Sequence, residues 1–237
     1  MNSLAINELI EQFHSSSAEE LVKQFGPEEL RDLQEQLAEI EHDQIDKRCS
    51  QAALYWAQNH TATEDPHYIE RGKPFIAPLP VKSYFVTLFD AFARSARLFI
   101  PKTREMLTSW CVMVYATHRA QWKKAEVIVQ TANEEKAKRL LEYANILYCN
   151  QPDWLRQRHP ITSASALAID WADGGKIFGI PSGEDKARMY HPTIYIMDEA
   201  AFLPGAEACY NAVNPVAKQI IAVSSAGPGW FADECTQ

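Results

Sequence analysis

A chain of 237 residues with 46% hydrophobic side chains can bury a sizeable core, and this length suits one principal domain with a smaller appendage. The sequence contains no apolar run near the roughly 18 residues that a membrane span needs, and its start lacks the residue order of a signal peptide. Five scattered cysteines, an odd number without close pairs, argue against a zinc site and a disulfide framework. We therefore expect a cytosolic protein with reduced, mostly buried cysteines and no membrane association.

The net charge of −8 is concentrated at one end of the sequence. Residues 1–48 hold 12 acidic and 4 basic residues, which accounts for the whole excess, and residues 49–237 hold 19 of each. A neutral main region neither supports nor excludes contact with nucleic acid, because a local basic patch does not require a basic total.

The first 60 residues have a helical pattern. Leu30, Leu33, Leu37 and Ile40 recur at helical spacing, and Pro27 suits a first helical turn. Residues 59–83 are then rich in prolines and also contain a glycine, and these residues break regular secondary structure. The sequence thus predicts an acidic helical appendage over residues 1–58, a connector over 59–83 and a main domain over 84–237.

In the main domain, short apolar strands alternate with helical stretches, which predicts a parallel sheet covered by helices in a three-layer α/β fold. The expected elements are a helix over 84–94, a strand over 96–100, a helix over 108–122, a strand over 126–130 and a helix over 133–148. A hairpin is expected from strands 167–171 and 176–180, which flank a glycine-containing turn. A strand over 193–197, a helix over 205–212 and a strand over 219–223 complete the pattern.

The strongest local motif is TIYIMDEAAF, residues 193–202, in which an apolar strand ends in Asp198 and Glu199. A buried parallel strand carries such acids at its carboxyl end, where open α/β sheets bind ligands. In P-loop ATPases the first acid of such a pair holds Mg²⁺ and the second orients the attacking water. A strand that ends in Asp-Glu before a helix also occurs as ordinary capping, so the motif needs a partner.

The candidate partner is the segment PKTREMLTSW, residues 101–110, between an apolar strand and a helix. A standard phosphate-binding loop, or Walker A motif, has glycines and a lysine directly before its final Ser or Thr. Here Leu107 and Thr108 stand at those two places. Alone, the segment is equally well interpreted as a solvated turn.

Together these segments resemble the terminase large subunits of tailed phages. Many members carry a deviant loop similar to Pro-Lys-Ser-Arg-Gln-Met-Gly-x-Ser-Trp, with the lysine at its beginning, and this chain matches at Pro101, Lys102, Arg104, Met106, Ser109 and Trp110. Residues 127–139, 182–202 and 221–231 are similar to further family segments, so the resemblance covers roughly residues 50–235. It implies a RecA-like ATPase fold of the additional-strand class.

The resemblance also implies ATP and Mg²⁺ as ligands and assigns roles to residues. Lys102, Thr103, Arg104, Thr108 and Ser109 would bind the phosphates, and Lys102 and Arg104 would also stabilise transition-state charge. Asp198 and Ser109 would hold Mg²⁺, and Glu199 would activate water. Leu107 departs from the family glycine, which puts the loop geometry in question.

Two further sites follow from the resemblance. Ser224 and Ser225 end a strand before a Gly/Pro turn, as in the family's coupling motif, although such strand ends are also common structural features. Arg188 aligns with a recurrent arginine, a candidate phosphate sensor or inter-subunit finger, or it is a plain surface arginine.

The expected function is that of the ATP-hydrolysing motor of a viral DNA-packaging terminase, in the host cytoplasm, from a bacteriophage or a prophage. By resemblance its partners are double-stranded viral DNA, a small terminase subunit, the portal protein and further copies of the chain in a ring. No nuclease activity is expected, because only Asp233 and Glu234 follow the coupling segment as acids. The rivals are another RecA-like ATPase and a degenerate, non-hydrolysing assembly or DNA-binding module.

Other conspicuous residues are assigned ordinary structural roles. The tryptophans are expected to pack in the core, and no adenine-contacting residue is assigned. The basic residues Lys123, Lys124, Lys136, Lys138 and Arg139 are interpreted as solvated helix ends and faces, with a DNA track as the minor alternative.

Overall fold

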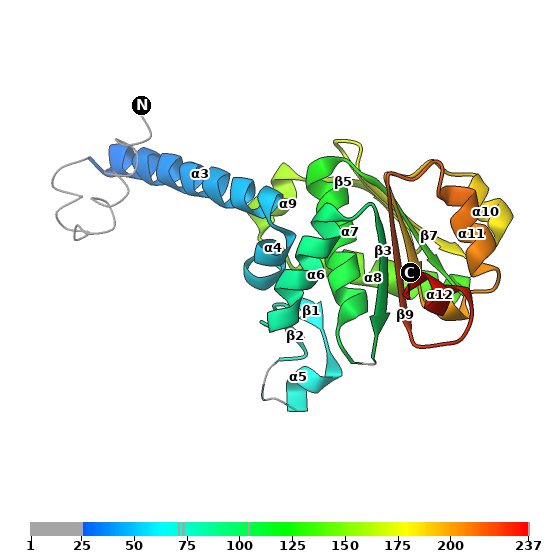
Figure 1. Ribbon diagram of the computed structural model, residues 1–237. Helices are drawn as coiled ribbons and strands as arrows, with labels where there is room; N and C mark the ends of the chain where they lie inside the picture. Colours follow the sequence, from blue (N-terminus) through cyan, green and yellow to red (C-terminus); the bar gives the residue numbers. More distant parts are fainter. Residues whose placement is uncertain (1–25, 71, 73, 104, 237) are drawn as a thin grey trace. The chain divides into compact units, whose positions relative to one another are not determined.

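The computed structural model describes residues 26–70, 72, 74–103 and 105–236 (Figure 1). The chain divides into two compact units, Met1–Arg48 and Cys49–Gln237. From Pro27 on, the first unit belongs to helix α3 (Pro27–Gln51), which begins at the proline expected in its first turn and carries Glu28 and Glu29 there. In the described part of the chain, no helix is both long and apolar enough to cross a membrane.

The second unit is built on a seven-stranded sheet in the order β3-β9-β8-β4-β7-β6-β5. Its strands, in chain order, are β3 (Arg97–Lys102), β4 (Glu126–Thr131), β5 (Ile161–Ala164), β6 (Ala168–Trp171), β7 (Lys176–Pro181), β8 (Ile194–Asp198) and β9 (Gln219–Ser225). The pairings from β3 through β9, β8 and β4 to β7 are parallel, and β5 and β6 extend the sheet in antiparallel fashion. Because β9 lies between β3 and β8, the sheet has the additional-strand topology expected from the sequence.

Helices cover both faces of this sheet and form three layers (Figure 1). One face carries α6 (Ser83–Arg94), α7 (Thr108–Lys123) and α8 (Glu134–Cys149), and the other carries α10 (Glu184–Arg188), α11 (Ala206–Val213) and α12 (Trp230–Glu234). The α11 face is filled by Ile128, Tyr195, Met197 and Ile220 among others. Since β4, β8 and β9 are buried on both faces, each carries a continuous apolar run, with its polar residues toward the strand ends.

The long elements were predicted closely, and the short ones were missed. Helix α7 begins at Thr108 and α8 follows Asn133, whose side chain accepts a hydrogen bond from the amide of Lys136 as an N-cap. The β6–β7 hairpin pairs as expected. The missed elements of the main domain are α9 (Asp153–Arg158), β5, α10, the 3-10 turn η1 (Ala200–Phe202) and α12, each too short to show a period.

The segment expected as a connector is itself folded. It follows α4 (Ala53–Asn59) and contains β1 (Thr63–Glu64), α5 (Pro66–Glu70) and β2 (Ile76–Ala77), with β1 and β2 paired antiparallel. Thr63, Tyr68 and Leu79 are buried. The described part of this stretch therefore contains short paired strands, a short helix and buried side chains.

The cysteines and the tryptophans follow the sequence interpretation in the main. Cys49, Cys111 and Cys209 are buried, Cys149 and Cys235 are exposed, and none of these five forms a disulfide with another described residue. Trp110 and Trp171 are buried, and the Trp110 ring stacks on Tyr143 with a centroid separation of 3.8 Å.

Helix α7 is held very close to the β6–β7 turn. A Cβ atom on Gly175 would lie 1.9 Å from the carbonyl oxygen of Ala120 in α7, far inside van der Waals contact. Only glycine permits this approach, because the obstacle is backbone and cannot rotate away. The turn thereby fixes the helix whose first residues adjoin the loop of residues 103–107.

Gly175→Ala should lower the free energy of unfolding by about 3 kcal/mol, since overpacking against a fixed backbone forces a shift of helix or hairpin. Asp173→Ala, an exposed change in the same turn, should alter it by less than about 0.5 kcal/mol. Urea unfolding of the three proteins measures the difference. Equal stability of the two variants would contradict the close approach.

Candidate nucleotide-binding site

The candidate site is assembled at one edge of the sheet, where β3, β9 and β8 all reach their carboxyl ends. Lys102 is paired in register with Ser225 of β9, and Val223 of β9 is paired with Asp198 of β8. The parallel pairing therefore collects three sequence motifs, separated by up to about 120 residues, at a single edge.

The loop between β3 and α7 adopts the backbone conformation that a glycine would favour. Leu107, directly before α7, has φ 53° and ψ 19°, in the left-handed region, and Glu105 has φ 64°. The carbonyl of Leu107 still accepts the first helical hydrogen bond, from the amide of Cys111 at 3.0 Å. The missing glycine therefore leaves the left-handed turn in place, at a strain cost of about 1 kcal/mol.

A tyrosine outside the motifs anchors the loop. Tyr84, in the first turn of α6, donates a hydrogen bond from its hydroxyl to the carbonyl of Met106 at 2.9 Å. The neighbouring Phe85 is fully buried, so it is part of the core. Sequence analysis missed the anchoring role of Tyr84, because no spacing relates it to residues 22 positions away.

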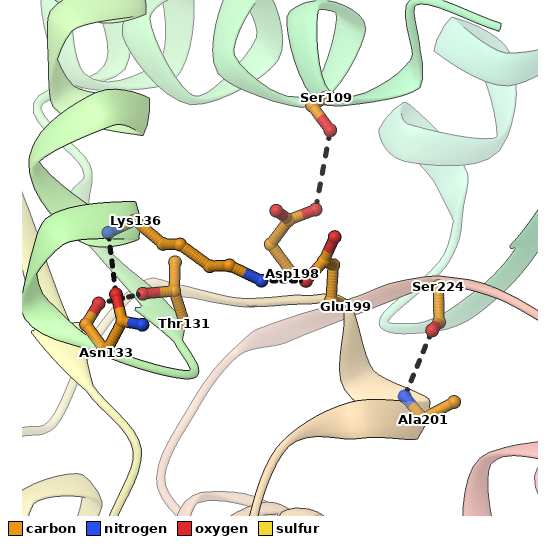
Figure 2. Close-up of polar contacts among 8 residues, drawn as sticks. All are labelled: Ser109, Thr131, Asn133, Lys136, Asp198, Glu199, Ala201 and Ser224. Carbon is orange, nitrogen blue, oxygen red and sulfur yellow. Dashed lines mark hydrogen bonds and ion pairs between the residues drawn. The ribbon is translucent and has the colours of Figure 1, made fainter. Parts of the chain in front are cut away.

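Asp198 projects toward the start of α7. Its Oδ1 lies 3.5 Å from Ser109 Oγ, the long limit of a hydrogen bond (Figure 2). Burial raises the pKa of Asp198 to about 6, the nearby ammonium of Lys102 opposes this rise, and the Glu199 carboxylate adds to it. The structure thus brings Lys102, Ser109 and both acids together.

Glu199 has strained backbone and a cationic partner. Its φ of 54° and ψ of 41° lie in the left-handed region, which non-glycine residues uncommonly occupy. Its Oε2 lies 2.5 Å from Nζ of Lys136, in the first turn of α8 (Figure 2). Lys136 is exposed, as the sequence interpretation has it, and it also contacts Glu199, a pairing that only the fold shows because 63 residues separate the two.

The two serines at the end of β9 face different surroundings. Ser224 is fully buried, and its Oγ accepts a hydrogen bond from the amide of Ala201 in η1 at 3.1 Å (Figure 2). Ser225, paired with Lys102, is partly exposed. After β9, a Cβ on Gly227 would lie 3.2 Å from the side chains of Ala201 and Phe202, so this segment packs against η1.

The remaining residues expected at the site differ in exposure and in position. Thr103 is exposed in the loop, Thr108 is buried at the start of α7, and Arg104 lies outside the described residues. Arg188 is exposed on α10 and forms an ion pair with Glu184 of the same short helix. The described contacts do not bring Arg188 to the loop.

A cleft of about 600 Å³ opens beside the loop, within the size range of small-molecule sites. Its walls combine the loop, the start of α7, residues of α8 and the folded segment before α6. The lining residues are Glu64, Asp65, Glu70, Phe75, Lys82, Lys102, Glu105, Met106, Leu107, Thr108, Ser109, Trp110, Arg139 and Tyr143.

Substitutions at Leu107 should reveal the left-handed conformation. Leu107→Gly should keep the free energy of unfolding within about 1 kcal/mol of the parent, because relief of strain offsets the added freedom of the unfolded chain. Leu107→Val should cost about 1–2 kcal/mol, since a β-branched residue tolerates positive φ poorly. Urea unfolding midpoints give the comparison, and a valine variant as stable as the parent would contradict the loop geometry.

Removal of the Asp198 charge should change how stability depends on pH. Its folded-state pKa of about 6 exceeds that of an unfolded aspartate, so the folded protein binds more protons between about pH 4 and pH 6 and loses stability as the pH rises through this window. At pH 7, Asp198→Asn should therefore be more stable than the parent, on the order of 2 kcal/mol, and the gain should shrink toward pH 4. Thermal unfolding at pH 4, 5, 6 and 7 measures it, and a gain independent of pH would contradict the assignment.

Comparison with known proteins gives matches in structure. No protein-family model and no curated protein matches the sequence. The large terminase of bacteriophage HK97 is similar with a TM-score of 0.54 and 11% identity, over 74% of this chain and 37% of that chain. An ATPase-domain mutant of the Thermus phage P74-26 large terminase has a TM-score of 0.46 and 14% identity, over 73% and 74% of the two chains.

A third structure, the large terminase of a thermophilic bacteriophage in complex with ADP, has a TM-score of 0.41 and 10% identity, over 63% of this chain and 39% of that one. At these identities a match concerns the fold, and of these three only the HK97 match exceeds a TM-score of 0.5. The described chain therefore has the three-layer, additional-strand α/β fold of the RecA-like type, which it shares with the large terminase of bacteriophage HK97.

Proposed function

We propose that this chain belongs to the terminase large subunits of tailed phages and is their ATP-hydrolysing motor domain. The observation that carries the proposal is the convergence of a glycine-like left-handed turn before α7 with the acidic end of β8, across an inserted β9. This arrangement suits a nucleoside triphosphate, because the amides at the start of a helix bind phosphate and the acids bind a cation.

Phosphate binding is assigned to the loop and the first turn of α7. Lys102, at the end of β3 and in the wall of the cleft, supplies the ammonium that a standard loop supplies from its far end. A long flexible side chain reaches phosphate oxygens from either end of a short loop. Thr103, Thr108 and Ser109 complete the proposed phosphate contacts, and Arg104 is assigned transition-state charge stabilisation by resemblance.

The residues present fit a Mg²⁺ ion. Ser109 and Asp198 would hold it, since a hydroxyl and a carboxylate supply the oxygen ligands that Mg²⁺ prefers and Ser109 Oγ lies 3.5 Å from Asp198 Oδ1. Binding a cation would also favour the ionised form of Asp198, whose burial otherwise favours the protonated form. When bound, Mg²⁺ would neutralise charge on the phosphate oxygens.

Glu199 is the proposed base. Its carboxylate adjoins the Asp198 site but is more exposed, so it is available to accept a proton from the water that attacks the γ-phosphate. Lys102 and Arg104 would stabilise the charge that develops on the transferred group. The left-handed backbone at Glu199 costs free energy, and such strain is typical of active-site residues whose side chains must be placed for a reaction.

We assign coupling to Ser224, Ser225 and the following turn. Ser224 bonds the backbone two residues beyond Glu199, so a shift of the acidic pair would reach β9 through η1. Ser225, beside Lys102, is the better candidate for sensing phosphate directly. Two contacts with η1, through Ser224 and Gly227, give this segment a physical route for passing on a change of state.

The partners belong to the same proposal. Double-stranded viral DNA is the proposed track. Further copies of the chain form the proposed ring, which would act on the portal protein. Residues 1–48 are the proposed docking region for a small terminase subunit. The acidic excess of residues 1–48 suits a protein-docking role better than a DNA-binding one, since acidic residues repel the phosphate backbone. Arg188, exposed on α10, is retained as a candidate inter-subunit finger.

The test is ATP turnover by the purified chain and its variants. Lys102→Ala should reduce kcat by at least about a hundredfold, because one preorganised charge at a transferring phosphoryl group contributes several kcal/mol. Thr108→Ala, at the standard lysine position, should lose much less, and Lys218→Ala, exposed near the opposite end of the sheet, should lose nothing. Similar mild effects of Lys102→Ala and Thr108→Ala would rule out the shifted lysine.

Glu199→Gln completes this test. The amide fills the same space but cannot accept a proton, so the variant should bind Mg²⁺-ATP with little change and lose turnover. Binding is measured by a fluorescent-nucleotide titration and turnover by phosphate release. A parent chain that binds nucleotide without hydrolysing it would favour the degenerate assembly module over a motor.

A further inference from the structure

We propose that Lys136 is a positioning residue for Glu199, which it holds by an ion pair at the edge of the site. The inference deepens the proposed function and rests on it, because it assigns Lys136 a role in orienting the proposed base. Among the residues that the structure describes, Lys136 Nζ lies 2.5 Å from Glu199 Oε2, and the two come from different layers of the fold.

The lysine side of the pair is anchored by a chain of hydrogen bonds. Asn133 caps α8 by accepting the amide hydrogen of Lys136 at 2.9 Å, and Thr131, buried at the end of β4, donates its hydroxyl hydrogen to the Asn133 carbonyl at 2.7 Å (Figure 2). The backbone of Lys136 is therefore tied to the sheet edge next to β8. A side chain that starts from a fixed backbone loses less entropy when it holds a partner.

On the glutamate side, the backbone conformation of Glu199 is fixed, while Lys136 is the partner found for its carboxylate among the described residues. Glu199 is the strained left-handed residue that joins β8 to η1, and its carboxylate forms no second ion pair or hydrogen bond within the described part of the chain. A carboxylate on three rotatable bonds would sample several positions, and the ammonium of Lys136 selects one of them. Near-attack geometry depends on such selection, since displacement of a catalytic group by about 1 Å costs much of the rate.

This ion pair differs from the basic–acidic pair formed within α8 itself. Lys138 bonds Glu134 within α8 at 2.7 Å, four residues apart, in the usual arrangement of a helix surface. The side chains of Lys136 and Lys138 are similarly exposed, at 50% and 45%. Because exposed pairs add little to stability, the contact with Glu199 is better explained by orientation than by folding.

The experiment compares matched lysine variants of the full chain in steady-state ATP hydrolysis. Lys136→Met, which keeps the aliphatic stem, should lower kcat about tenfold and leave KM within about twofold, because the base is misplaced while the phosphate contacts remain. Lys136→Arg should recover most of the rate, since arginine also forms an ion pair. Lys138→Met should behave like the parent, and circular dichroism with thermal unfolding checks that all variants fold.

A double variant separates orientation from other effects. In the Glu199→Gln background, Lys136→Met should leave the residual kcat unchanged, because no base remains to be positioned. A parent chain without ATP turnover would refute the proposed function and not this inference alone. With an active parent, the inference is overturned by a Lys136→Met rate equal to or above the parent, by a rise confined to KM, or by no recovery in Lys136→Arg.

Discussion

The parallel pairing of β9 with both β3 and β8 is the constraint on which the site depends. It sets Lys102 beside Ser225 and Asp198 beside Val223, so the loop strand and the acidic strand end at the same edge of the sheet with one strand between them. This spacing brings the loop, the start of α7 and the acidic end of β8 to one edge of the sheet. If β3 paired directly with β8, no inserted strand would connect the β3–α7 loop with η1, and the buried hydroxyl of Ser224 would have no partner there.

The loop and the acidic pair are held in conformations that work against stability. Leu107 and Glu199 occupy left-handed backbone without being glycine, and Asp198 has a pKa raised by burial to about 6. Each of these features costs free energy in the folded chain, and each is offset by packing elsewhere, above all by the two-sided burial of β4, β8 and β9. Several destabilising features at one edge of the sheet are typical of a functional site, because selection for stability alone would not retain them.

Charge balance at this edge comes from two lysines on different elements. The charge of Lys102, on the loop side, lowers the pKa of Asp198, and Lys136 in the first turn of α8 forms an ion pair with Glu199. The two acids are adjacent in sequence, yet their surroundings differ in burial and in partner. Different surroundings allow two neighbouring carboxylates to take different roles, one as a cation ligand and one as a base.

The sequence by itself determined the layered α/β architecture and the order of the long elements. Alternation of apolar strands with helical stretches depends on local periodicity, so α6, α7, α8 and the core strands were predicted within one or two residues. Short elements such as α9 and α10 carry no period and were missed. The acids at residues 198 and 199 and the loop at 101–110 were identified because both interrupt an apolar pattern with polar residues at a strand end.

Only the tertiary structure decided how these motifs meet. The left-handed turn at Leu107 could not be inferred, since sequence propensity disfavours it and the surrounding fold overrides that preference. The anchoring of Met106 by Tyr84 and of Glu199 by Lys136 joins residues 22 and 63 positions apart, which no periodicity relates. Ser224 and Ser225 are neighbours in sequence but have different surroundings, because side chains alternate along a strand and the two faces of this sheet pack against different helices.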